Sequence, residues 1–241
     1  MIRSLVTTAG TLLGLTALVM ALLSGPGHRW GLWSFMSGFS ILKWAVFIAI
    51  AALLISIAGA VLTRPGSGHP GFYRMIVVAV LSLSMISVPV YWLYRAKQVP
   101  RIHDISTDST DPPRFVAVLP LRTNASNPVE YGGAAIAAQQ HRAYADISTL
   151  TLPGPPAAVF EQALVVAKGL GWDIVAADAD ELRIEATDTT FWFGFKDDIV
   201  IRIRAGDADG SRLDIRSLSR VGLSDVGTNA RRIRAFIEMM K

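Results

Sequence analysis

Residues 44–62 read WAVFIAIAALLISIAGAVL, a run without a single charged side chain. Two further runs share this character, one from Leu5 to Leu23 and one from Met75 to Tyr94. A helix needs about 20 apolar residues to cross the hydrocarbon core of a bilayer. Because lipid offers no hydrogen-bond partners to the backbone, each run must be helical to lie there. The sequence therefore predicts three transmembrane helices.

Charge divides the chain near residue 100. Residues 1–100 carry seven basic side chains and no acidic one, whereas residues 101–241 carry sixteen basic and all nineteen acidic side chains. Subtracting acidic from basic counts gives +7 for the first part and −3 for the second. A basic protein often binds nucleic acid, but this basic excess lies beside the apolar runs. We expect the lipid bilayer as a partner and no nucleic acid.

Three regions follow from these patterns. We expect a three-helix transmembrane region over 1–95, a Pro-rich linker over 96–128 and a soluble domain over 129–241. The linker is predicted from five prolines with Ser, Thr, Asn and Asp between them, which is typical of irregular, extended chain. Asn127-Pro128, with Glu130 just after, also indicates a capped helix start.

The charges also bear on which side of the membrane the soluble domain lies. Cytoplasmic loops carry more Lys and Arg than loops on the other side. The three basic residues on the side of the amino terminus are Arg3, Arg64 and Arg74, and the five on the opposite side are Arg29, Lys43, Arg95, Lys97 and Arg101. This count favours a cytoplasmic soluble domain. The first run could instead be a cleaved signal peptide, but no small-x-small cleavage site follows it.

Hydrophobic periodicity predicts the elements of the soluble domain. A helix is expected from Pro155-Pro156 to about Leu170, with glycines at its end. Alternating apolar residues predict one hairpin over 172–186 and a second over 199–216, whose turn lies at 205–210. We place Leu213 and Ile215 inward on the return strand of the second hairpin. The residues that we place outward there are Arg212, Asp214 and Arg216.

A last helix is expected over 228–240. Its buried stripe would be Ile233, Phe236, Ile237 and Met240, and its solvent-facing residues Arg231, Arg232, Arg234 and Glu238. Shorter elements are a small-residue helix over 134–140 and strands over 144–152 and 191–195. The aromatic run at 191–195 could alternatively enter a bilayer as a wedge. The predicted fold class is α+β, with three transmembrane helices followed by an antiparallel sheet that has helices packed on one face.

Composition excludes several kinds of chemistry. The chain has no cysteine, so disulfides, thiolate metal sites and cysteine nucleophiles are absent. The histidines lie at no metal-ligand spacing, and no phosphate loop or dinucleotide fingerprint occurs. The aspartates that resemble a calcium loop lack its spacing and read better as solvated linker and hairpin turn; they are Asp104, Asp108, Asp111, Asp207 and Asp209. We expect no metal and no cofactor.

The adjacent carboxylates Asp197 and Asp198 are the first candidate site. Neighbours on a strand point to opposite faces, so one of the two must face the apolar side. An unpaired carboxylate is costly there, so we expect a partner, for which Arg216 and Arg220 are the candidates. This pair is either a structural salt bridge or part of a polar pocket with a shifted carboxylate pKa.

A second candidate is the polar run from Arg216 to Gly227, which leaves a strand and enters a helix. Its serines, glycines and helix amino terminus could hold an anion through backbone N–H groups, with Arg216 and Arg220 adding charge-assisted contacts. The alternative is ordinary helix capping by Ser224, Asp225 or Thr228. A serine hydrolase is not expected, because Val226 stands where the nucleophile elbow needs glycine.

These stretches carry a family resemblance. Phe195-Lys196-Asp197-Asp198, Arg216-Ser217, Ser219-Arg220-Val221-Gly222 and Ser224-Asp225 resemble the domain of unknown function 1499 (DUF1499) family, over roughly residues 101–241. Tyr144-Ala145-Asp146-Ile147 and Gly171-Trp172 fit the same pattern, although many relatives have proline where Ala145 stands. The family has no assigned activity. Its members occur in bacteria, often with amino-terminal spans or an export signal, and in plastid-bearing lineages. The resemblance implies a multi-pass protein of the bacterial inner (plasma) membrane with its soluble domain in the periplasm.

We therefore expect a non-catalytic, membrane-anchored protein of the cell envelope that binds a small anionic ligand, a lipid headgroup or a protein partner. The predicted ligand-binding residues are Asp197, Asp198, Arg202, Arg216, Ser219, Arg220, Ser224, Asp225 and Asn229. The first alternative is a membrane-tethered enzyme that uses an Asp197 or Asp198 carboxylate with an arginine anion clamp. A transporter-associated subunit is the second, and it is disfavoured because the three runs contain no ionisable residue.

Overall fold

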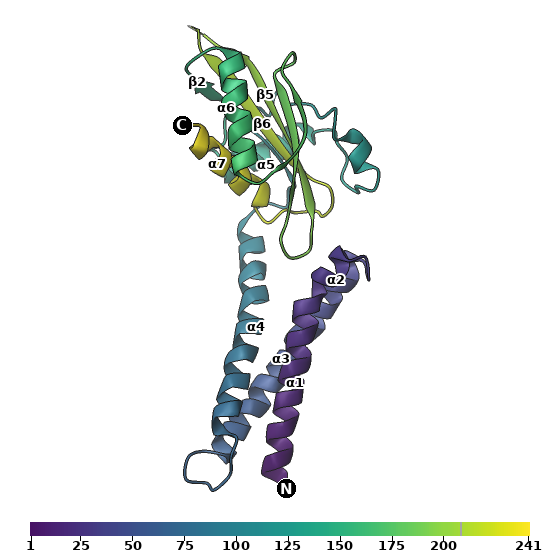
Figure 1. Cartoon of the computed structure of the whole chain (residues 1–241), viewed down its shortest axis with the longest axis vertical. Coiled ribbons are helices and arrows are strands. Elements are labelled where there is room, and N and C mark those ends of the chain that lie inside the picture. Colours follow the sequence, from purple (N-terminus) through teal and green to yellow (C-terminus); the bar gives the residue numbers. More distant parts are fainter. Residues whose placement is uncertain (208) are drawn as a thin grey trace. The chain divides into compact units, whose positions relative to one another are not determined.

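The computed structural model describes residues 1–207 and 209–241. Ala208, which belongs to the turn predicted over 205–210, lies outside the described residues. The contacts divide the chain into two compact units (Figure 1). Unit 1 comprises Met1–Tyr94 and Phe191–Gly194, and unit 2 comprises Arg95–Thr190 and Phe195–Lys241.

Unit 1 is helical. Its helices are α1 (Ile2–Ser24), α2 (Pro26–Arg29), α3 (Phe35–Leu62) and most of α4 (Phe72–Gln98). Three helical segments, 2–29, 35–62 and 72–98, are long and apolar enough to cross a membrane. The sequence-based prediction of three apolar helices is thus confirmed, and their length and composition indicate a membrane-associated protein.

Small residues bring α1 and α3 together. Gly10 of α1 is buried, and a Cβ atom built on it would lie 3.2 Å from Ile55 Cγ2 of α3. On α3 the buried positions include Ala45, Ala49 and Ala52. In lipid no hydrophobic force drives apolar helices together, so they associate through close backbone approach at small residues.

Unit 1 also contains the turn Phe191–Gly194, where we expected a strand. Gly194 has φ +68°, a conformation that interrupts extended chain. Phe193 is buried, with its ring centroid 4.6 Å from that of Phe39. Arg29 Nη1 donates to the Phe191 carbonyl at 2.6 Å. The strand prediction for 191–195 is therefore wrong, because these contacts hold the segment as a turn.

Unit 2 contains a six-stranded antiparallel sheet in the order β1-β6-β5-β4-β3, with β2 also paired to β6. The strands are β1 (Asp104–Ser106), β2 (Leu150–Leu152), β3 (Asp173–Asp178), β4 (Arg183–Thr189), β5 (Lys196–Ala205) and β6 (Ser211–Ser219). Both predicted hairpins are present. The expected strand over 144–152 is much shorter, because only Leu150–Leu152 pairs with β6.

One face of the sheet, here called the apolar face, includes Ile201 of β5 and Ile215 of β6, both fully buried. It is covered by α6 (Pro156–Gly169) and α7 (Thr228–Met240), whose residues join a single hydrophobic core with it. Trp172 stacks on Phe236 of α7 in this core, with ring centroids 5.6 Å apart. The α+β prediction with helices on one face is confirmed.

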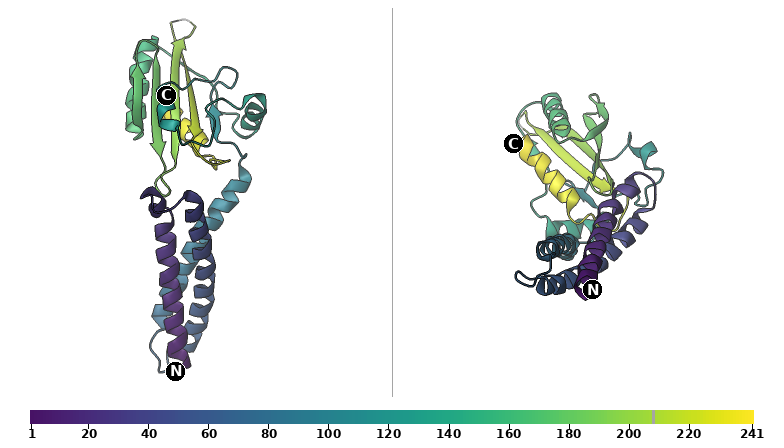
Figure 2. Two further views of the ribbon diagram at one scale, coloured as in Figure 1. Left: turned by 90° about the vertical axis from the view of Figure 1, so that its right-hand side faces the viewer. Right: turned by 60° about the horizontal axis from the view of Figure 1, so that its bottom comes forward.

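The opposite face, here called the polar face, includes Val200 and Leu218 and is also covered. Phe115 and Val118 pack on these two residues. They belong to the chain over 104–130, which holds β1 and the short 3-10 helix η1 (Leu119–Arg122). Figure 2 shows the green α6 and this teal segment on opposite sides of the sheet. Much of the range that we predicted as a linker therefore packs on the domain.

Two neighbouring details also differ from expectation. The small-residue helix is present as α5 (Gly133–Ala143). No helix begins at Asn127, however, and its side-chain amide instead donates to the carbonyls of Ser219 and Gly222, each at 3.0 Å. Asn127 thereby fastens the covering segment to the end of β6, which satisfies two carbonyls that leave the sheet.

Candidate functional site

The predicted site residues divide between the two faces of the sheet. Asp197 shares the apolar face with Ile199 and Ile201, whereas Asp198 shares the polar face with Val200, as strand alternation requires. Arg202 also lies on the polar face, because it is two residues from Val200. Arg216 and Arg220 lie there as well, since each is two residues from Leu218. The sheet therefore separates the nine residues, and they do not meet in one pocket.

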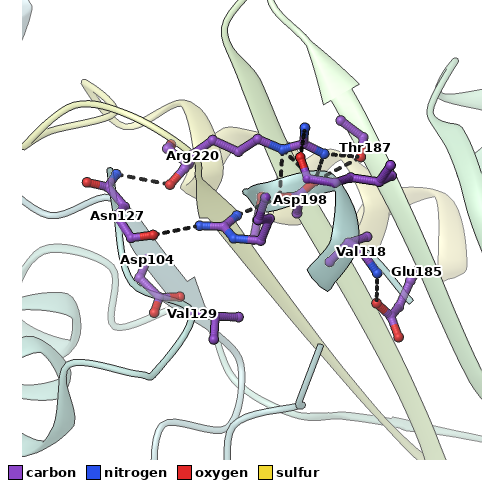
Figure 3. A network of polar contacts seen from close by, with 12 residues as sticks. Asp104, Val118, Asn127, Val129, Glu185, Thr187, Asp198 and Arg220 are labelled. Atoms are coloured by element: carbon purple, nitrogen blue, oxygen red, sulfur yellow. Dashed lines mark hydrogen bonds and ion pairs between the residues drawn. The ribbon is translucent and has the colours of Figure 1, made fainter. Parts of the chain in front are cut away.

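Asp198 is the centre of the polar face. It is fully buried and accepts hydrogen bonds from Arg122 Nη1 at 2.5 Å, Arg220 Nη2 at 2.7 Å and the Thr187 hydroxyl at 2.8 Å. Figure 3 shows Arg220 between Asp198 and Thr187, with Asn127 on its other side. Arg220 was one of the two partners expected for the carboxylate on the apolar side, and it pairs instead with Asp198 on the polar face. Arg122 was missed, because it lies 76 residues away in an aperiodic segment.

Arg216 pairs with Asp104 and not with the Asp197-Asp198 pair. Two of its nitrogens donate to the Asp104 carboxylate at 2.8 and 2.9 Å, a bidentate arrangement that strengthens the pair. The guanidinium carbon lies 5.1 Å from the ring centroid of Phe115 and 5.5 Å from that of Tyr131. Arg216 and Asp104 are both buried, so neither the outward position of Arg216 nor the solvated position of Asp104 is correct.

Tyr131 belongs to this cluster. Burial, together with the Asp104 charge, raises the pKa of the Tyr131 hydroxyl to about 12. This hydroxyl is buried and has no hydrogen-bond partner among the described residues. The phenol therefore stays neutral beside the Asp104–Arg216 ion pair, and it donates no hydrogen bond to either residue.

Glu185 of β4 anchors the covering segment and was not predicted from the sequence. Its fully buried carboxylate accepts the backbone N–H groups of Val116, Ala117 and Val118, each at 3.0 Å. Arg183 Nε lies 3.0 Å from the same carboxylate. Because three successive N–H groups need an acceptor where the chain is not in a ladder, the glutamate replaces a missing strand partner. Nothing in the local sequence pattern marks it.

Arg202 lies in a second polar cluster. It donates to Asp214 at 3.2 Å and to Asp111 at 3.0 Å, and Arg204 donates to Asp214 at 2.8 Å. Burial alone would raise the pKa of Asp108, but hydrogen bonds from the N–H groups of Asp111 and Thr110 and from Arg204 hold that pKa below its usual value. Asp214 is fully buried, in contrast to its predicted outward position.

On the apolar face, Asp197 pairs with Arg232 of α7 at 2.7 Å. Arg232 also donates to Asp188 at 2.7 Å and to the Asn229 side-chain oxygen at 2.5 Å. Asn229 in turn donates to the Ser219 hydroxyl at 3.0 Å. The prediction that the inward carboxylate is paired is confirmed, but its partner is Arg232, which we had placed in water. A buried carboxylate draws this arginine inward.

Ser224 and Asp225 lie at the start of α7. Asp225 accepts the N–H of Gly227 at 2.8 Å and that of Asn229 at 2.7 Å, and Ser224 accepts the N–H of Val226 at 3.2 Å. Burial raises the pKa of the Asp225 carboxyl, and the same two N–H groups oppose the rise. Asp225 thereby satisfies the Asn229 donor in the first turn of α7, whereas the Ser224 contact lies in the loop before the helix. Their role as ligand-binding residues stays a prediction.

The surface groove of this domain lies beside the same helix. It has a volume of about 250 Å³ and is open to solvent. The residues that line it come from α7, the end of β4 and the chain before β3; they are Leu170, Trp172, Asp188, Thr228, Arg231, Arg232 and Ala235. Of the residues in this groove, none belongs to the predicted set. No group of three or more His, Asp or Glu side chains that could hold a metal ion occurs within 1–207 and 209–241.

Comparison with known proteins completes this picture. A search of curated proteins found no match. The profile of the family described as "Protein of unknown function (DUF1499)" matches residues 104–240, which is more than half of the chain. The match begins at β1 and ends in α7, so it includes the covering segment as well as the sheet. The chain therefore belongs to the DUF1499 family of proteins of unknown function.

Proposed function

We propose that this protein is a non-catalytic binding module of the bacterial cell envelope, with its helices in the inner membrane and unit 2 in the periplasm. The proposed ligand is a small anion with an apolar portion, and the proposed site is the groove beside α7. The observation that carries this proposal is the composition of that groove, which combines an exposed arginine with an apolar wall.

The state of the carboxylates supports a non-catalytic role. Asp197 and Asp198 are 3% and 0% exposed, and each accepts hydrogen bonds from arginine. A general acid or base must come within hydrogen-bond reach of a substrate proton. Both carboxylates are instead enclosed by Arg122, Arg220 and Arg232. A tethered enzyme built on these aspartates is therefore the less favoured alternative.

Two arginines line the groove. Arg232 is shared by the carboxylates of Asp188 and Asp197. Arg231 is exposed, and its guanidinium donates to the Val226 carbonyl and the Thr228 hydroxyl, which orient it in the groove. The amino-terminal end of α7 adds a positive partial charge. An anion would be attracted by both, and its apolar portion would rest on Leu170 and Trp172.

The test is binding by the full chain in detergent micelles. Benzoate and inorganic phosphate are the anionic probes, and benzyl alcohol is the neutral analogue. We expect benzoate to raise the unfolding temperature and benzyl alcohol to have no effect, because the charge supplies the attraction. Arg231→Gln should abolish the benzoate shift, whereas Arg142→Gln, at an exposed arginine of α5, should keep it. Equal shifts in both variants, or none in the native chain, would reject the site.

The periplasmic assignment has a separate test. A reporter that is active on only one side of the membrane is fused after Lys241. Activity of an alkaline phosphatase fusion, which needs the periplasm, supports the assignment. Activity of a cytoplasmic reporter at the same position contradicts it.

A further inference from the structure

The two ends of the sheet in unit 2 differ in charge. The β3–β4 and β5–β6 turns lie at the same end, since Arg183 at the start of β4 pairs with Arg202 near the end of β5. That end, here called the acidic end, carries five carboxylates in or beside the turns: Asp178, Asp180, Glu181, Asp207 and Asp209. Four of these five are exposed, and Asp178 is half-buried. The arginines at this end are Arg183, which pairs with Asp178 and Glu181, and Arg204 and Arg212 beside the second turn, so the carboxylates are in excess.

The opposite end, here called the tether end, is where the chain enters from α4. Lys97, Arg101 and Lys196 are exposed there. The Lys196 carbonyl accepts the Arg220 N–H at 3.0 Å, and the carbonyl of residue 102, next to Arg101, accepts the Asp225 N–H at 3.1 Å. These bonds place Lys196 and Arg101 on either side of the loop that follows β6.

Exposed leucines lie among these cations. Leu223, in the loop between β6 and α7, is 70% exposed. Leu121 of η1 is 51% exposed, and its carbonyl accepts from Arg220 Nη1 at 2.8 Å, which holds η1 beside the end of β6. Single exposed leucines are ordinary on a protein surface. Exposed leucines that share a surface with lysine and arginine are instead typical of proteins that bind at a bilayer interface.

Chain connectivity limits where the tether end can go. α4 is long and apolar enough to cross a membrane and ends at Gln98. The first carbonyl fixed to the domain is that of Ile102. Only residues 99–101 separate the two, and three extended residues span about 10 Å. The tether end must therefore remain close to the surface from which α4 emerges.

We propose that the tether end docks on the anionic headgroup surface of the membrane that holds α4. Leu121 and Leu223 enter the interfacial region, and Lys97, Arg101 and Lys196 contact lipid phosphates. The carboxylates close in sequence to Leu223 and Arg101 are engaged, since Asp225 accepts the N–H groups of Gly227 and Asn229 and Asp104 pairs with Arg216. The acidic end faces away from the lipid, because like charges repel it from an anionic surface.

The absence of cysteine permits a direct test. The variants Leu223→Cys and Asp180→Cys of the full chain are each labelled with an environment-sensitive fluorophore and placed in vesicles of phosphatidylcholine with phosphatidylglycerol. We expect the label at position 223 to emit at shorter wavelength and to be quenched by a lipid-borne quencher, and the label at position 180 to show neither effect. Identical behaviour at the two positions would overturn the proposal.

The charge requirement has its own arm. Arg101→Glu and Lys196→Glu, introduced with the label at position 223, should remove the wavelength shift, and so should vesicles of phosphatidylcholine alone. Lys241→Glu, at the exposed carboxyl-terminal residue, is the matched control and should keep the shift. A shift that survives in neutral lipid and in both tether-end variants rejects an anionic surface as the partner. A shift that is not accompanied by quenching from the lipid-borne quencher indicates a protein contact and also rejects it.

Discussion

The two faces of one sheet are covered in opposite ways. On the apolar face, α6 and α7 form a continuous hydrophobic core with Ile201, Ile215 and Phe236. On the polar face, an irregular segment is held by buried ion pairs and by a carboxylate that binds backbone N–H groups, with four buried apolar residues in its cluster. The difference teaches that a chain without periodicity can still form a cover if charges in the sheet satisfy its polar groups.

This comparison predicts its largest effect at Asp198. Asp198→Ala leaves the guanidinium groups of Arg122 and Arg220 buried without their carboxylate, so we expect unfolding to become easier by about 3–5 kcal/mol. Urea-dependent proteolysis of the full chain in detergent, followed at residues 104–241, measures this change. The control is Asp180→Ala in an exposed turn, which should change little. A similar small effect for both variants would mean that the polar face does not stabilise the fold.

A smaller effect on stability is expected on the apolar face from the loss of a single methylene group. Ile201 is fully buried against the core. Ile201→Val should cost about 0.5–1.5 kcal/mol, because the helices close only partly over the lost volume. The same proteolysis measurement applies, with Val165→Ala at a 68% exposed position of α6 as control. An Ile201 variant as damaging as the Asp198 variant would remove the contrast between the faces.

An ion pair outside both faces gives a smaller effect still. Arg234 donates to Asp146 at 2.6 Å, but the side chains are 42% and 57% exposed. Arg234→Gln should cost less than about 1 kcal/mol. The Arg234 hydrogen bond holds the pKa of Asp146 below its usual value, so its contribution is present above the ordinary Asp pKa and is lost as pH falls through the lowered one. Stability measured between neutral and acid pH should therefore converge for the two chains.

Tyr131 should give almost no effect at neutral pH and a selective one in alkali. Its hydroxyl has no partner within the described part of the chain, so Tyr131→Phe should leave stability nearly unchanged at pH 7. Burial raises the folded-state pKa of Tyr131 to about 12, from the ordinary tyrosine value of about 10. The native chain should then lose stability as pH rises from about 10 through 12, and the variant should lose less. If the stabilities of the native chain and the variant instead fall in parallel across that pH range, burial does not hold the Tyr131 phenol neutral.

The apolar face could be predicted from the sequence, whereas the polar face could not. The spacing of Val159, Phe160 and Ala163 marks the buried side of α6, and alternation marks both hairpins. Periodicity says nothing about Glu185 or Arg122, whose partners lie 67 to 76 residues away. Prolines around Phe115 indicate loop, and the pattern does not show that this loop is buried.

Charged residues on α7 show the same limit in the candidate site. Arg232 has a helical position beside the buried stripe, and solvent is the ordinary place for arginine. Only the arrangement of Asp188 and Asp197 on neighbouring strands gives it a buried partner. The sequence indicated that one carboxylate of the Asp197-Asp198 pair needed a cation, but four arginines between 216 and 232 could have supplied it. Tertiary contact decides among them.

The Asp104–Arg216 pair has a consequence for how the protein is made. Its two residues are 112 positions apart. The covering segment contains β1 and precedes all the other strands of the sheet. During synthesis this segment leaves the ribosome long before β5 and β6 exist. Its proline-rich chain includes Arg122, which is buried in the folded domain. This chain stays exposed to water until the β5–β6 hairpin has formed. Closure of the covering segment is thereby deferred until β6 has been synthesised, because closing so long a loop yields no stabilising contact until Arg216 is present.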